Sequence, residues 1–120
     1  MDAVDGARDE LRTLHKKLDA ATAKNRDSLR ADLQDAGTQA QRIADSLKTL
    51  AGQQRADASN GLAQASSKLE KAAANAKDAA SANEEKLRQA NQSMLTHTRQ
   101  ALQNVSEAVA AKRAELQKRA

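Results

Sequence analysis

Apolar and small residues recur along this chain at intervals of three, four and eleven positions. One column spaced by eleven runs through residues 18–73, and a second runs through residues 36–80 and resumes at Leu102. A third column contains Leu50, Ala72, Met94, Val105 and Leu116. Eleven residues make three turns of α-helix at about 3.67 residues per turn, so each column lies on one helical face. The pattern therefore predicts long amphipathic helix.

Shorter steps within these columns indicate packing of helix against helix. Between Val4 and Ala21 the apolar positions are spaced by three and four, which is the heptad spacing of a coiled coil. Extra four-residue steps follow at residues 29–40 and 101–108, and such steps relax a left-handed supercoil. We expect the helices to interact through a Leu/Ala seam, whose larger members are Leu11, Leu14, Leu18, Leu29, Ile43, Leu47, Leu50, Leu62, Leu69, Leu87, Met94, Val105 and Leu116.

The position of the turns depends on the four glycines, which are the only strong breaks in the pattern. Asn60 and Gly61 make the best turn signal and lie at mid-chain. They predict one helical domain over residues 1–120, with a helix at about 3–57, a turn at about 58–61 and a helix at about 62–119. Two alternatives stay open. One is a single continuous helix, because the eleven-residue phase passes through residues 58–65; the other is a three-helix bundle that turns at Gly37 and near Ser81.

Composition supports an all-α fold. The chain has 120 residues and contains no Pro, which would interrupt a helix, and no Phe, Tyr or Trp. Alanine, leucine, lysine, arginine, glutamine and glutamate are the best helix formers. The 28 alanines far outnumber the larger apolar side chains, so a lone helical pair would bury little apolar surface. We therefore predict a long antiparallel helical hairpin or coiled-coil bundle that self-associates or binds a partner helix.

Charge adds one candidate contact. The 20 basic and 16 acidic residues give a net charge of +4, which is mild. Four bases gather near the C-terminus, at Lys112, Arg113, Lys118 and Arg119. Bases in a last helical turn match the helix dipole, and they also permit a weak contact with an anionic surface. Specific nucleic-acid binding is not expected, since no aromatic residue is present for base stacking.

The polar residues predict no catalytic, cofactor or metal site. His15 and His97 are the only histidines, and two ligands do not make a structural zinc site. Glu84 with Arg88, and Glu115 with Arg119, have the spacing of helical ion pairs. Three asparagines, Asn25, Asn83 and Asn91, interrupt the apolar columns. A buried seam asparagine fixes helix register, and Asn83 is the candidate for that role.

Targeting segments are not predicted either. The chain does not open with a charged segment followed by an apolar run, so no signal peptide is expected. It has no apolar stretch of 18 residues, so no transmembrane segment is expected.

The eleven-residue period over residues 18–116, and the texture of residues 71–80, resemble the amphipathic repeats of group 3 late embryogenesis abundant proteins and of exchangeable apolipoproteins. This resemblance implies helices that bind lipid surfaces reversibly or protect against stress. Apolipoprotein repeats contain Pro and aromatic residues, which this chain lacks, and their absence argues against strong lipid binding. We therefore predict a non-enzymatic structural or protein-interaction coiled-coil module, with the lipid-surface or stress-protection role as the alternative.

Overall fold

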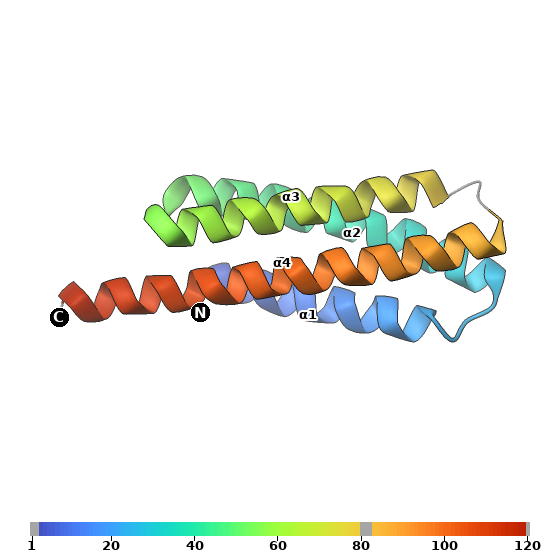
Figure 1. Cartoon of the computed structure of the whole chain (residues 1–120), viewed down its shortest axis with the longest axis horizontal. Helices are drawn as coiled ribbons and strands as arrows, with labels where there is room; N and C mark the ends of the chain where they lie inside the picture. Colours follow the sequence, from blue (N-terminus) through green and yellow to red (C-terminus); the bar gives the residue numbers. More distant parts are fainter. Residues whose placement is uncertain (1–2, 80–82, 120) are drawn as a thin grey trace.

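The chain forms a bundle of four α-helices in this computed structural model (Figure 1). The helices are α1 (Ala3–Ala21), α2 (Arg26–Gln53), α3 (Ala56–Ala79) and α4 (Glu84–Arg119). The structure describes residues 3–79 and 83–119, except for the side chains at positions 56, 115, 116, 118 and 119. Within these ranges there is no strand, so the predicted all-α fold is confirmed.

Successive helices run in opposite directions and surround one core (Figure 1). α1 packs against α2 and α4, and α3 packs against the same two helices from the opposite side, so α1 and α3 lie on a diagonal. The bundle measures 54 × 21 × 18 Å. Apolar residues from all four helices form a single buried cluster.

The turn predicted at residues 58–61 is wrong, and the predicted hairpin of two long helices is replaced by four shorter ones. The described connections lie at residues 22–25 and 54–55, and a third follows Ala79 and ends at Asn83. Gly61 of the predicted turn, and Gly37 of the alternative one, lie buried inside α3 and α2. A glycine inside a helix lowers the stability of the helix by only about 1 kcal/mol relative to alanine. Packing against a backbone that approaches too closely for a side chain offsets this loss.

Amides, rather than glycines, mark the breaks between the helices. The Asn25 carboxamide oxygen accepts a hydrogen bond from the Ser28 N–H at 3.0 Å, and that of Asn83 accepts one from the Lys86 N–H at 2.9 Å. Both are helix N-caps, which satisfy N–H groups that the first helical turn leaves free. Gln54 ends α2, and its N–H donates to the Ala51 carbonyl. The alternative turn near Ser81 falls on residues outside the described ranges, but α4 begins directly after them.

These amides also reveal a repeat of 29 residues. Asn25, Gln54 and Asn83 are 29 positions apart, and so are sets of buried core residues. These sets include Leu29, Ala58 and Leu87; Leu33, Leu62 and Asn91; and Ala40, Leu69 and Thr98. Twenty-nine residues make about eight turns of helix at 3.6 residues per turn, so the seam keeps its phase from one helix to the next. The next position in the series is Lys112, which is not an amide, and α4 continues past it to Arg119.

Small residues bring α2 and α3 close together. A Cβ atom added to Gly37 would lie 2.5 Å from the Ala76 Cβ, which is far inside van der Waals contact. Two serines of α3 hydrogen-bond across the same interface at 2.8 Å, Ser59 to the Ala51 carbonyl and Ser66 to the Ala44 carbonyl. The interface therefore repeats every seven residues, with a small side chain against the opposite backbone at each step.

Small residues also line the α3–α4 interface, whereas large residues line the interfaces of α1. A Cβ atom on Gly61 would lie 2.9 Å from the Asn104 carbonyl oxygen and 3.1 Å from the Ala108 Cβ, so α3 also approaches α4 closely. By contrast, α1 contributes three fully buried leucines to the core, Leu11, Leu14 and Leu18. We infer that close backbone approach positions α3, whereas burial of large side chains holds α1.

The glycines provide a direct test of this packing. We expect Gly37→Ala to lower the free energy of unfolding by about 1–3 kcal/mol relative to Gly52→Ala, because only the first overpacks an interface. Gly52 is the matched control, since it lies in the same helix and a Cβ there meets nothing within 4 Å. Urea denaturation measures the difference. Equal stability of the two variants would contradict the close approach, and adding Ala76→Gly to Gly37→Ala is expected to restore part of the loss.

Candidate interaction site

The predicted seam residues meet inside the bundle rather than on an open face. Eleven of the thirteen are at most 1% exposed, namely Leu11, Leu14, Leu18, Leu29, Ile43, Leu47, Leu62, Leu69, Leu87, Met94 and Val105. Leu50 is half-buried against the core, and the Leu116 side chain lies outside the described residues. The seam thus supplies a core within one chain.

Four large buried residues were missing from the predicted seam, and one of them is Val4, which is 2% exposed. Leu33 is 1% exposed, and the four-residue steps around it could have revealed it. Leu95 and Val109 are each 7% exposed and adjoin the seam residues Met94 and Ala108. Leu95 continues the first eleven-residue column after a gap at Glu84, so the period could have revealed it, whereas Val109 lies off all three columns. They widen the apolar face of α4, which contacts three helices.

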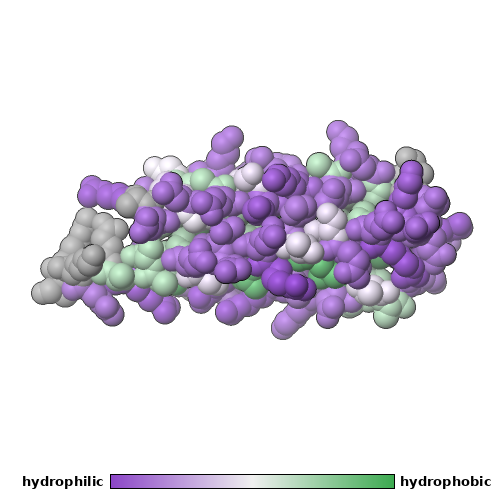
Figure 2. Space-filling view, in the orientation of Figure 1, coloured by the Kyte–Doolittle hydropathy of each residue, from purple (hydrophilic) through white to green (hydrophobic). Residues whose placement is uncertain are grey.

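On the face drawn in Figure 2, polar residues cover most of the surface, and apolar residues show in smaller patches between them. A groove with a volume of about 630 Å³ follows the α2–α3 interface. Its floor contains Gly37, Ala73 and Ala76, and its charged rim residues are Arg42, Asp45 and Lys77. The groove exists because small residues draw the two helices together and leave no large side chain to fill the space above them.

A polar pair replaces apolar contact at one layer of the α1–α4 interface. Asn91 is 1% exposed, and its carboxamide nitrogen donates to the Thr22 hydroxyl at 2.8 Å. Asn91, rather than Asn83, is therefore the buried asparagine of the seam, and the register role predicted for Asn83 is wrong because Asn83 caps a helix in an exposed position. One heptad farther along α4, Thr98 is fully buried, and its hydroxyl has no hydrogen-bond partner among the described residues. A buried amide nitrogen that is hydrogen-bonded across an interface, as in Asn91, favours one register over others.

The end of α1 is held by charged groups from two neighbouring helices. The Arg88 guanidinium of α4 donates to the Thr22 carbonyl at 3.2 Å and to the Lys24 carbonyl at 3.4 Å. It also pairs with Glu84 at 3.0 Å, so the predicted ion pair is confirmed. A cation beside these carbonyls balances the negative end of the α1 dipole, whose last turn has no base of its own.

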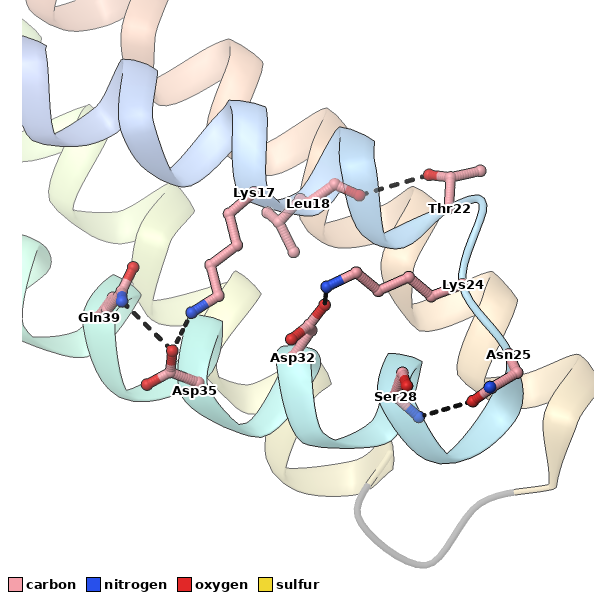
Figure 3. A network of polar contacts seen from close by, with 9 residues as sticks. All are labelled: Lys17, Leu18, Thr22, Lys24, Asn25, Ser28, Asp32, Asp35 and Gln39. Atoms are coloured by element: carbon pink, nitrogen blue, oxygen red, sulfur yellow. Dashed lines mark hydrogen bonds and ion pairs between the residues drawn. The ribbon is translucent and has the colours of Figure 1, made fainter.

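Ion pairs on the other side of this end join α1 and its turn to α2 (Figure 3). Lys17 pairs with Asp35, and Lys24 pairs with Asp32 at 2.6 Å. Because these side chains are partly exposed to solvent, each pair contributes at most about 1 kcal/mol. They orient the turn at residues 22–25 more than they stabilise the bundle.

His97 of α4 has the one resolved pKa shift among the described groups. Burial lowers the pKa of His97 below its usual 6.5, because desolvation disfavours the charged imidazolium. The nearby cations Lys68 and Lys71 of α3 lower it further, and a hydrogen bond with Gln100 opposes them. His97 is therefore neutral at pH 7.

The remaining predicted groups are described only in part. No three His, Cys, Asp or Glu side chains in the described residues are placed to hold a metal ion. Arg113 is exposed and Lys112 is half-buried. The side chains of Lys118 and Arg119 lie outside the described residues, as does the predicted pair of Glu115 with Arg119.

Across the described ranges, no helix is both long and apolar enough to serve as a membrane span.

The shifted pKa of His97 predicts a pH dependence of stability. The unfolded chain binds a proton at His97 more readily than the bundle does, so stability falls as the pH drops below 6.5. We expect His97→Gln to remove this part of the decline between about pH 8 and about pH 5.5, a range in which histidine titrates and ordinary carboxylates stay ionised. Thermal melts of both proteins across this range measure the effect.

An NMR titration gives an independent reading of the same group, because the chain has only two histidines. The His97 pKa is expected to lie below 6.5 and to rise in Lys71→Gln, since that change removes one of the repelling charges. A His97 pKa at or above 6.5 in the unaltered chain would contradict the prediction.

Comparisons with protein-family models, with curated proteins and with solved structures found no match to this chain.

Proposed function

We propose that this chain is a non-enzymatic structural and protein-interaction module that packs helix against helix through its Leu/Ala seam. The observation that carries the proposal is the 29-residue repeat of buried positions. Because positions such as Leu33, Leu62 and Asn91 are equivalent in successive helices, the helices present closely related faces to one another. A helix with the same pattern, from a second copy or from a partner protein, would be able to take the place of one of these helices.

The exterior supports an interaction role more than a chemical one. The α2–α3 groove is lined by Ala, Gly and uncharged polar residues, with three charged residues at its rim. Its one carboxylate, that of Asp45, accepts a hydrogen bond from the Gln41 side chain at 3.1 Å. General acid–base catalysis needs titratable groups that converge on one reacting atom. The two cations at this rim, Arg42 and Lys77, instead suit contacts with acidic side chains of a docked protein.

The alternative is a reversible lipid-surface or stress-protection role. The large apolar side chains are buried in the core of the bundle. Lipid binding would therefore require the helices to separate and expose these side chains. The half-buried Lys112 and the exposed Arg113 would favour an anionic lipid surface in that event. No aromatic residue is present to anchor a separated helix at the interface.

Circular dichroism and sedimentation separate these roles. For the proposed module, we expect high helicity and a cooperative thermal transition in plain buffer, with no change when vesicles of anionic phospholipid are added. The physical reason is that the apolar seam residues are already buried against other helices of the bundle. A chain that is disordered in buffer and becomes helical only with vesicles or on drying would overturn the proposal in favour of the alternative.

A further inference from the structure

The apolar seam continues in helical phase through the connection between α2 and α3. On the α2 side it contains Leu47 and Ala51, and on the α3 side Ala58 and Leu62. The steps of four, seven and four residues between them are those of one unbroken helix. A loop that only reversed the chain direction would have no need to preserve this phase.

The residues of this connection are compatible with helix. Gln54 and Arg55 are both good helix formers, and neither is Gly or Pro. α2 and α4 each begin with an asparagine cap, whereas the residue before α3 is Arg55, whose side chain has donors only and cannot cap free N–H groups. Among the described connections, residues 54–55 thus have the least chemistry that specifies a turn.

Opening this connection would join α2 and α3 into one helix over residues 26–79, about 80 Å long at 1.5 Å per residue. The hydrogen bonds from Ser59 to Ala51 and from Ser66 to Ala44 would then break within the chain. The same partners become available from a second open copy, because its α3 presents the same residues. Every interface between the two halves of the bundle can form in this way between two chains.

We propose that this chain forms a dimer by exchanging halves at Gln54–Arg55, so that α1 and α2 of one copy pack with α3 and α4 of the other. This inference rests on the proposed interaction role and names a second copy as the partner. Because the two forms share their core contacts, they differ chiefly in the conformation of two residues and in the entropy of association. Protein concentration during folding therefore decides which form is made.

Thr38 and Lys77 report on the exchange. Both are exposed and line the α2–α3 groove, so labels on them lie near each other in the closed bundle. In an open chain they are on one helix and about 58 Å apart at 1.5 Å per residue. The chain has no native cysteine, so Thr38→Cys with Lys77→Cys gives two specific labelling sites.

The experiment refolds the doubly labelled full chain with excess unlabelled chain, at low and at high protein concentration. Sedimentation separates monomer from dimer, and the label distance is measured within single chains. We expect monomers with a short distance at low concentration, and dimers with a long distance at high concentration. Monomer at every concentration, or a dimer that keeps the short distance, would overturn the exchange. The proposed module would survive either result if the monomer is helical and melts cooperatively.

Arg55→Pro tests the hinge itself. Gln54 has φ −107° and ψ 170°, an extended conformation that suits the residue before proline, so the backbone at Gln54 is compatible with the change. Proline inside the continuous helix is expected to weaken the dimer roughly a hundredfold for each of the two helices. Arg55→Ala is the matched control and is expected to keep the dimer. Should Arg55→Pro not fold, Arg55→Asn, which supplies the missing cap, is expected to weaken the dimer roughly fivefold at each connection. A dimer unaffected by the folded variants would exclude this hinge.

Discussion

The close approach of α3 to its two neighbours is the constraint on which the rest of the bundle depends. Gly37 opposite Ala76, and Gly61 opposite the Asn104 carbonyl, leave no room for another carbon atom. Interfaces this tight bury little apolar surface for each residue, yet they bring many backbone atoms within van der Waals range. They allow a chain with few large side chains to close a core, because the larger residues are then needed mainly along α1, α2 and α4.

Polar residues decide which of several similar packings forms. A seam made of alanine and leucine tolerates shifts of register, because its members differ little in shape. The Asn91–Thr22 hydrogen bond and the Ser66–Ala44 hydrogen bond each require one register, since a shift would leave a buried polar group unpaired. The Arg88 contacts at the end of α1 act in the same way from the surface.

Much of the core could be predicted from sequence, whereas the breaks between helices could not. Spacing by three and four identified eleven of the thirteen proposed seam residues as core, because burial on a helix follows its period. Turn prediction failed because Gly61 and Asn25 were given the wrong roles. From local sequence alone, an Asn-Gly pair predicts a turn. Only the packed neighbouring helix shows that Gly61 is there because a side chain would prevent the close contact. Asn25 was placed in the seam because its position fits the period, although its side chain caps a helix.

The sequence by itself determined that the chain is helical and which face of each helix is apolar, because propensity and period are local properties. Only the tertiary structure decided where the helices end and that the seam closes within one chain. The physical reason is the repeat of about eight helical turns. Because of it, the buried positions fall on one face whether the chain is one straight helix or a folded bundle. The choice between them depends on contacts such as Gly37 with Ala76, which join residues far apart in the sequence and have no local signature.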